Sequence, residues 1–193
     1  MLENRMNPFE TIHLSDQPGS GNLYARQYNT ALNQFRSALF KGQVFRLKRR
    51  VLHRSQRLYD LNTLKPDLHM HGSSYSGIQV VPVSSIIGSE GKATDFDIDF
   101  HPLSEAARER WVNVAMAYLA HLPLPPVQLI QVGDAYFVRD GHHRISVSRA
   151  FGQIAMDAEV ITWKSAPPFP WQPGAVQERP CSLKSPGLST RLG

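Results

Sequence analysis

Cysteine is almost absent from this chain of 193 residues, which contains only Cys181. A single cysteine cannot form a disulfide within the chain, so a small disulfide-stabilised fold is excluded and a reducing compartment is favoured. Long apolar runs are absent too: the longest, residues 112–122, is interrupted by Asn113 and His121 and is far shorter than the ~20 residues of a membrane-spanning helix. The first residues lack the apolar core of a secretory signal. We therefore expect a cytoplasmic protein.

Acidic residues are scarce in the first third of the chain. Residues 1–65 contain eleven Lys and Arg against four Asp and Glu, whereas residues 66–193 contain ten against twelve. The net charge of +5 therefore belongs to the N-terminal part. The excess is densest in residues 46–57, where helical spacing would place apolar side chains on one face and cations on another. The cations considered for binding are Arg46, Arg49, Arg50 and Arg57.

Three interpretations of this basic segment remain open. It could be a solvated amphipathic helix packed on its own domain, a surface that binds DNA or RNA phosphates without sequence preference, or a surface for an anionic membrane. Residues 23–41 also have a helical period, and Gly42 is a natural break between the two segments. The pattern predicts a basic helical hairpin over residues 22–65, after an N-terminal extension of residues 1–21.

The strongest motif lies in residues 136–152. Tyr136, Phe137 and Val138 favour a short strand, Asp140-Gly141 breaks it, and apolar residues from Ile145 predict a short helix that ends at Gly152. The trio His142-His143-Arg144 would then lie at the start of this helix, where backbone N–H groups and the positive end of the helix dipole face outward. Such a trio suits an anion, most often a phosphate, although a solvated helix start is the alternative.

The preceding residues favour the phosphate interpretation. Residues 124–132 predict a strand and Gly133-Asp134 a tight turn, so a hairpin leads into the helix. This arrangement resembles the ParB/sulfiredoxin superfamily, and Asp140-Gly141-His142-His143-Arg144 is most similar to the branch that includes free-serine kinases using ATP or ADP. The resemblance extends over residues 78–163 and is strongest in 125–152. It implies an α+β domain with a small mixed sheet and flanking helices, and a nucleotide, ATP or ADP with Mg²⁺, held by residues 140–144.

The resemblance also suggests catalytic residues. Residues 78–87 predict a first core strand, and in the serine-kinase branch a glutamate after that strand is the general base. This implies that Glu90 accepts the hydroxyl proton, unless it is a solvated turn residue, and His143 is the second catalytic candidate. A sulfiredoxin-type reductase is disfavoured because His142 stands where the cysteine would be.

Other segments give weaker signals. In residues 95–100 Asp alternates with apolar residues, which predicts an edge strand with its carboxylates in water or near a nucleotide-bound Mg²⁺. Residues 66–77 have turn chemistry and predict a linker, so His69 and His71 are not expected to form a metal site. Residues 164–193 predict a proline-rich, extended tail, too rich in proline for a helix-turn-helix DNA reader.

Two classes of function follow. The first is a nucleotide-dependent phosphotransferase acting on a small hydroxyl-bearing substrate. The second is a nucleotide-gated or non-specific nucleic-acid-binding protein that uses the basic hairpin. A nuclease has less support, since only His142, His143 and nearby acids would serve it.

Overall fold

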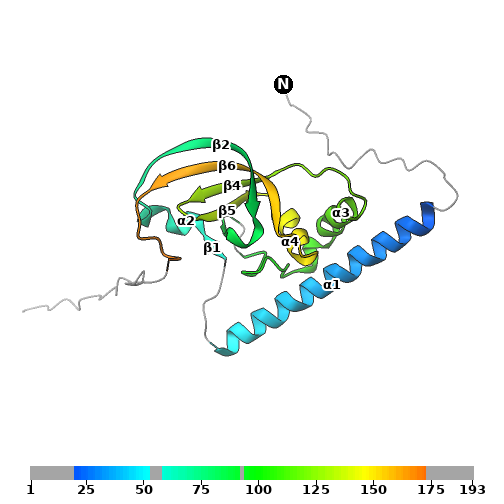
Figure 1. The fold of residues 1–193 in the computed structure, drawn as a ribbon. Coiled ribbons are helices and arrows are strands. Elements are labelled where there is room, and N and C mark those ends of the chain that lie inside the picture. Colours follow the sequence, from blue (N-terminus) through cyan, green and yellow to red (C-terminus); the bar gives the residue numbers. More distant parts are fainter. Residues whose placement is uncertain (1–19, 53–57, 92–93, 173–193) are drawn as a thin grey trace, which may run out of the picture.

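The centre of the protein is a mixed sheet of six strands in the order β1-β3-β5-β4-β6-β2. The computed structural model in Figure 1 describes residues 20–52, 58–91 and 94–172. The strands are β1 (Tyr59–Asp60), β2 (Met70–Pro82), β3 (Ile86–Ser89), β4 (Val127–Val132), β5 (Ala135–Asp140) and β6 (Ala155–Ser165). Strands β1, β3 and β5 are parallel to one another, β4 is antiparallel to β5 and parallel to β6, and β2 is antiparallel to β6. The expected combination of a mixed sheet with helices is confirmed.

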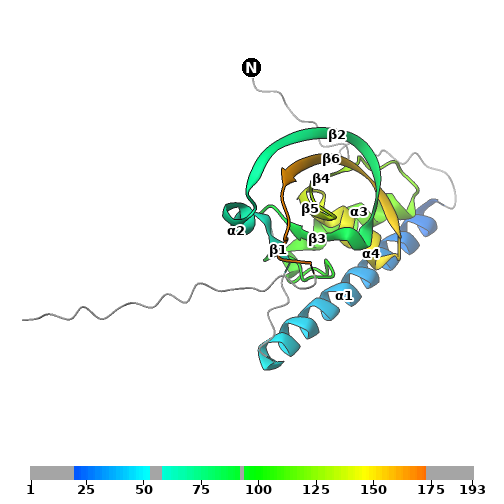
Figure 2. The same ribbon diagram turned by 60° about the vertical axis from the view of Figure 1, so that its left-hand side comes forward.

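The helices form layers beside the sheet. They are α1 (Ser20–Leu52), α2 (Leu61–Leu64), α3 (Arg108–Leu119) and α4 (His142–Ala150), with short 3-10 helices η1 (Lys65–Asp67), η2 (Val83–Ser85) and η3 (Glu105–Ala107). Helix α3 packs on α4, and α1 in turn packs on α3 (Figure 1). In Figure 2 the long strands β2 and β6 curve over the shorter strands. No helix within the described residues is both long enough and apolar enough to cross a lipid bilayer.

The expected helical hairpin is wrong, because α1 is one continuous helix from Ser20 to Leu52. Gly42 lies inside it and serves close packing: a Cβ at this position would be 2.6 Å from the carbonyl oxygen of Pro102. The helix also belongs to the core. Ala31 and Phe35 are fully buried, and the rings of Phe35 and Trp111 are 5.6 Å apart. Helix α1 is therefore packed against the domain.

The expected linker at residues 66–77 is wrong for a similar reason. Most of it forms the first part of β2, which pairs with β6 along its length. Gly72 and Gly77, taken as turn residues, have positive φ angles where the register of this pairing shifts. The expected first strand is also divided: β2 ends at Pro82, η2 follows, and β3 begins at Ile86. Pairing with a distant strand overrides the local turn signals.

The beginning of the expected tail is part of the fold. Strand β6 continues to Ser165, and Phe169 is buried at 4% exposure against Gly133. Trp171 stacks on Phe169, and its Nε1 donates a hydrogen bond to Asp134 Oδ1 at 3.1 Å. These aromatic side chains close the β4–β5 end of the sheet. The rest of the tail, residues 173–193, and most of the N-terminal extension, residues 1–19, lie outside the described residues.

Candidate functional site at the start of α4

Three parallel strands end at the same edge of the sheet. Strands β1, β3 and β5 are neighbours and end at Asp60, Ser89 and Asp140. Helix α4 begins at His142, two residues after β5. The carboxyl ends of parallel strands, together with the start of a following helix, are the usual place for a ligand in sheets of this kind. The motif found in the sequence therefore lies where the topology favours binding.

Gly141 makes the turn between β5 and α4 possible. Its φ of +100° is in the left-handed region, and a Cβ there would be 2.5 Å from Val127 Cγ1. Gly141 is also the N-cap of α4 and has no side chain with which to cap it. The first turn contains no acidic residue, so the positive end of the helix dipole is not neutralised from within the helix.

The imidazole of His142 faces the interior. Its side chain is buried, with the residue 4% exposed, and Nε2 lies 2.7 Å from the hydroxyl of Ser89. The same hydroxyl accepts a hydrogen bond from the backbone N–H of Gly91 at 3.2 Å, and the ring of Phe96 stacks on the imidazole at 6.0 Å. The expectation that both imidazoles face a ligand is therefore wrong for His142. Consecutive residues of a helix point about 100° apart, so the His142 ring is buried while the His143 ring lies near the surface.

His143 keeps the expected position. The residue is half-buried, and its ring meets the face of Phe96 edge-on, with 5.5 Å between the ring centroids. Phe96 thus fixes both imidazoles at the start of α4. A half-buried imidazole beside the helix N-terminus can approach a bound anion.

Glu90 comes directly after β3 and follows Ser89, whose hydroxyl contacts His142. Its backbone N–H donates to Val138 O of β5 at 2.9 Å. Its carboxylate accepts hydrogen bonds from Lys65 Nζ at 3.3 Å and Arg139 Nε at 3.0 Å, and its side chain is 19% exposed. Asn62, in α2, donates its side-chain amide to the backbone carbonyl of Glu90. Segments distant in the sequence therefore place one carboxylate between two cations.

Sequence reasoning missed both cations. Arg139 lies in β5 immediately before the expected site, and its nearness to the turn was a signal that could have identified it. Lys65 gave no such signal, because only the pairing of β1 with β3 brings η1 beside Glu90. We name Lys65, Glu90 and Arg139 the charge triad.

Arg144 has a different role from the one expected. Its Nη1 donates to the backbone carbonyls of Pro125 and Pro126, the latter at 2.9 Å, and its Nη2 donates to Asp140 Oδ2 at 2.7 Å. Its side chain is only 14% exposed. Burial lowers the pKa of the Arg144 guanidinium, and the charge of Asp140 opposes this shift. Arg144 therefore joins the entry of β4 to the start of α4, with its donors directed at protein oxygens.

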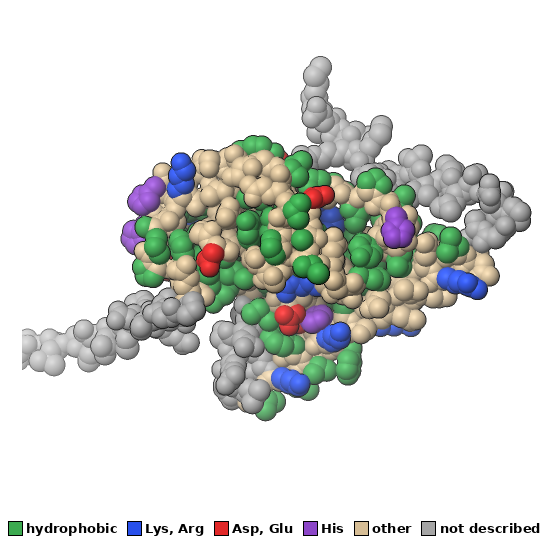
Figure 3. Space-filling view, in the orientation of Figure 1, with side chains coloured by type: hydrophobic (Ala, Val, Ile, Leu, Met, Phe, Trp, Pro, Cys, Tyr) green, Lys and Arg blue, Asp and Glu red, His purple; other side chains and the backbone are tan. Residues whose placement is uncertain are grey.

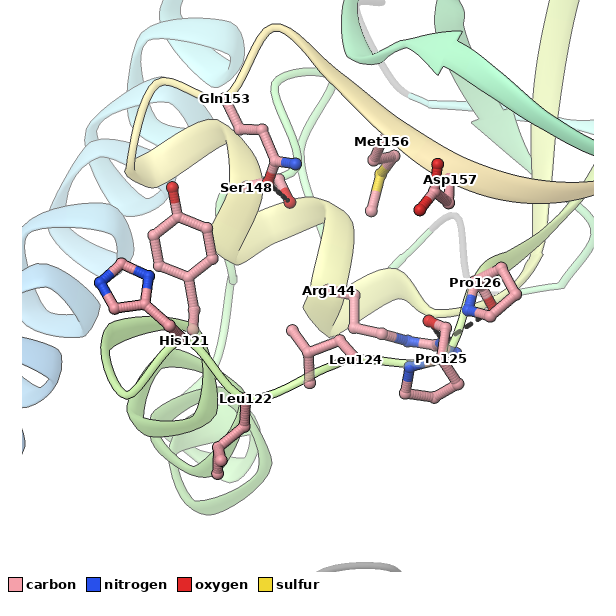
Figure 4. A pocket seen from close by; sticks show the side chains of 11 residues that line it. His121, Leu122, Leu124, Pro125, Pro126, Arg144, Ser148, Gln153, Met156 and Asp157 are labelled. Atoms are coloured by element: carbon pink, nitrogen blue, oxygen red, sulfur yellow. Dashed lines mark hydrogen bonds between the residues drawn. The ribbon is translucent and has the colours of Figure 1, made fainter.

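A hollow of about 290 Å³ opens on the Arg144 side of α4 (Figure 4). Its apolar wall includes Leu124 and Met156, and its polar groups include Asp157 and Gln153. Ser148, one turn after Arg144, donates a hydrogen bond to Gln153 Oε1 at 2.9 Å. In Figure 4 these side chains surround an open space between α4, the end of α3 and the start of β6. Because Arg144 lines the hollow and belongs to the first turn of α4, the hollow lies next to that turn.

The expected row of three aspartates does not form. Asp97 is 4% exposed and folds back, accepting hydrogen bonds from the N–H groups of Asp99 and His101 at 2.9 and 2.8 Å. Its Oδ2 is 2.9 Å from His101 Nδ1. The segment is thus a turn stabilised by Asp97, and its carboxylates do not share one face. Within the described residues, no group of three His, Cys, Asp or Glu side chains is placed to hold a metal ion.

The cations expected to bind nucleic acid are described only in part. The side chain of Arg46 is exposed on α1, whereas the side chains of Arg49 and Arg50 and all of Arg57 lie outside what the structure describes. Nucleic-acid binding by this segment stays a prediction.

Comparison with family models, curated proteins and solved structures finds no match for this chain.

Proposed function

We propose that the protein binds the phosphates of a nucleotide, ATP or ADP, at the start of α4, and that it transfers a phosphoryl group to a small hydroxyl-bearing substrate. The observation that carries this proposal is the position of the charge triad. Glu90 follows Ser89, whose hydroxyl is 2.7 Å from Nε2 of His142 in α4. Lys65 and Arg139 bind the two carboxylate oxygens of Glu90. The site therefore combines positive charge for phosphates with a carboxylate that can accept a proton.

Electrostatics favour an anion at this place. The N-terminus of a helix acts as roughly half a positive charge. Lys65 and Arg139 carry two positive charges, of which Glu90 balances one, and their side chains are 40% and 46% exposed, so a ligand in solvent can reach them. Phosphate oxygens are acceptors for such donors, and charge-assisted hydrogen bonds are about twice as strong as neutral ones.

Glu90 and an incoming phosphate would share the same two cations. A bound phosphate draws Lys65 and Arg139 toward its own oxygens and leaves the Glu90 carboxylate available to the substrate hydroxyl. The hydroxyl oxygen then attacks phosphorus, its proton passes to Glu90, and the bond between the transferred phosphorus and the leaving phosphate oxygen breaks. Binding of the nucleotide therefore makes the Glu90 carboxylate available as a base. Mg²⁺ held by the phosphates would supply further charge neutralisation.

The hollow beside Arg144 gives the remainder of the nucleotide a place to bind. Its volume, about 290 Å³, is near the lower end for small-molecule sites, roughly 300–1,000 Å³. Leu124 and Met156 provide apolar surface for a planar base, and Gln153 and Asp157 provide an amide and a carboxylate for its polar edge. The resemblance of residues 125–152 to nucleotide-using members of the ParB/sulfiredoxin superfamily supports the same assignment.

Calorimetric titration of the full chain with ATP, ADP, CTP and GTP, with and without Mg²⁺, tests the proposal. We expect saturable binding of an adenine nucleotide. Mass spectrometry of a mixture of small alcohols and hydroxyl amino acids incubated with protein and nucleotide should then detect a phosphorylated product. If the chain binds none of the four nucleotides, the proposal is wrong. If it binds a nucleotide but forms no phosphorylated product, the protein binds nucleotides and the proposed transferase activity is wrong.

A further inference from the structure

Helix α1 has exposed apolar side chains on the side opposite its buried face. Its inner face, with Ala31, Phe35 and Ala38, is buried. With 3.6 residues per turn, residues at intervals of four, three and four positions form a row on the opposite side. We name this row the outer stripe, and it consists of Phe40, Val44, Leu47 and Val51. Phe40 is 67% exposed, Leu47 63% and Val51 70%. The stripe is thus an apolar surface directed away from the core.

The charges that α1 itself carries are of one sign. The sequence of α1 contains seven Lys and Arg residues and no Asp or Glu. Lys41 and Lys48, one position after Phe40 and Leu47, are exposed along one flank of the stripe. Together with Phe40, Val44 and Phe45 they line a hollow of about 260 Å³ that faces Asp99 and His101. Figure 3 shows cationic and hydrophobic side chains side by side along the lower edge of the molecule, where α1 lies.

These features argue against two kinds of partner. A second copy of α1 packed stripe to stripe would bring two acid-free cationic helices together, and like charges at this range repel. A nucleic acid would use the cations, but it would gain little from Phe40 and Leu47, because phosphates neutralise charge and do not bury aliphatic side chains. The partner that suits the outer stripe has negatively charged groups at its surface and an apolar region directly beneath them.

We propose that the C-terminal half of α1 binds the surface of an anionic phospholipid membrane. Phe40, Val44 and Leu47 enter the boundary between headgroups and acyl chains, and Lys41 and Lys48 contact lipid phosphates. Basic residues beside a row of large apolar ones are the pattern of helices that lie in this interface. The stripe extends over roughly 16 Å of helix, long enough to lie flat on a bilayer without crossing it. This surface is separate from the nucleotide site, and the proposal does not depend on that site.

Co-sedimentation of the full chain with vesicles tests the proposal. The vesicles contain either phosphatidylcholine alone or phosphatidylcholine with phosphatidylglycerol. We expect binding to the second kind, weakened by salt. Leu47→Gln should reduce the affinity on the order of tenfold, since it removes a large apolar side chain from the interface. The double variant Lys41→Gln/Lys48→Gln should reduce it by a similar or greater factor, because each lysine near an anionic surface contributes on the order of fivefold.

Matched variants separate specific from general effects. Ile154→Gln removes an apolar side chain that is 85% exposed and lies outside α1. Arg108→Gln/Arg110→Gln removes two exposed cations from α3. Both should bind vesicles like the unchanged protein, and circular dichroism should show all variants folded, because every altered side chain is exposed.

Three outcomes would overturn the proposal. The first is the absence of binding to vesicles that contain phosphatidylglycerol. The second is binding that survives Leu47→Gln, which would mean that charge alone holds the protein and that the outer stripe does not insert. The third is a concentration-dependent dimer, seen by light scattering without vesicles and abolished by Leu47→Gln, which would assign the outer stripe to a second copy. Binding of duplex DNA in place of vesicles would assign the cations of α1 to nucleic acid.

Discussion

The hydroxyl of Ser89 and the imidazole Nε2 of His142 are 2.7 Å apart, and both residues are buried. This contact joins the last residue of β3 to the first residue of α4. Glu90 follows Ser89 directly, so the same hydrogen bond sets the position of the general-base candidate relative to the start of the helix. A buried polar pair of this kind holds geometry, because separating its members would leave polar groups without water.

Substitution of Glu90 separates catalysis from binding. Glu90→Gln should reduce phosphotransfer roughly 10²–10⁴-fold, because the amide cannot accept the substrate proton. Nucleotide affinity should stay the same or increase, since Lys65 and Arg139 lose the carboxylate that competes with phosphate for them. Turnover is measured by nucleotide consumption and affinity by calorimetry. Glu109→Gln, an exposed carboxylate on α3, is the matched control. Unchanged turnover in Glu90→Gln would show that Glu90 is not the general base.

The two cations of the charge triad should contribute to nucleotide affinity. Lys65→Gln and Arg139→Gln should each weaken binding on the order of tenfold, the effect of one partly exposed charge-assisted hydrogen bond to phosphate. The loss should shrink as salt is raised, because the exposed part of each interaction is screened. Calorimetry at low and moderate salt measures both effects, with Arg108→Gln as the control. Equal affinity in all three variants would place the phosphates elsewhere.

Arg144 should act on stability. Arg144→Met removes hydrogen bonds to the carbonyls of Pro125 and Pro126 and to Asp140, and it leaves those carbonyls short of a donor. We expect a loss of about 2–4 kcal/mol in the free energy of unfolding, measured by urea denaturation. Arg108→Met, whose side chain is 62% exposed, should change stability by less than about 0.5 kcal/mol. An equally small effect for Arg144→Met would contradict its bridging role.

Gly141 should not tolerate a side chain. Gly141→Ala forces a Cβ to 2.5 Å from Val127 Cγ1 and places alanine at a φ of +100°. The combined strain and overlap should cost about 2–4 kcal/mol of unfolding free energy, and nucleotide binding should weaken with the displaced helix start. Gly21→Ala is the comparison, because nothing lies within 4 Å of its Cβ position. In the first part of α1 that change should be neutral or stabilise by up to about 1 kcal/mol.

The sequence predicted the local parts of this fold well. The hairpin of β4 and β5 and the helix after it follow from Gly133, Gly141 and short apolar runs, whose conformations depend on near neighbours. Position 42 was misread because the demand on that glycine comes from Pro102, far along the chain. The turn at Asp97 was misread as a strand because alternation of apolar residues does not reveal hydrogen bonds from a carboxylate to its own backbone.

The candidate site shows the same division. Gly141 and His143 lie in one continuous motif and could be located from it. The deeper burial of His142 than of His143, and the hydrogen bonds from Arg144 to the carbonyls of the prolines before β4, depend on packing that one segment does not reveal. Lys65 reaches Glu90 only because the short strand β1 joins β3. When several segments form a site, the sequence therefore predicts only the residues that belong to one continuous motif.

The pairing of β2 with β6 sets an order of events during synthesis of the chain. Strand β2 leaves the ribosome early, but β6 does not begin until Ala155, so β2 must wait for almost the whole domain. Tyr75, Ile78 and Val80 are exposed on β2 even in the finished fold. In a nascent chain stalled before β6, the edge of β2 that later pairs with β6 would be open to other chains. Slow translation between Pro82 and Ala155 should therefore lower the yield of soluble protein more than slow translation after Ser165.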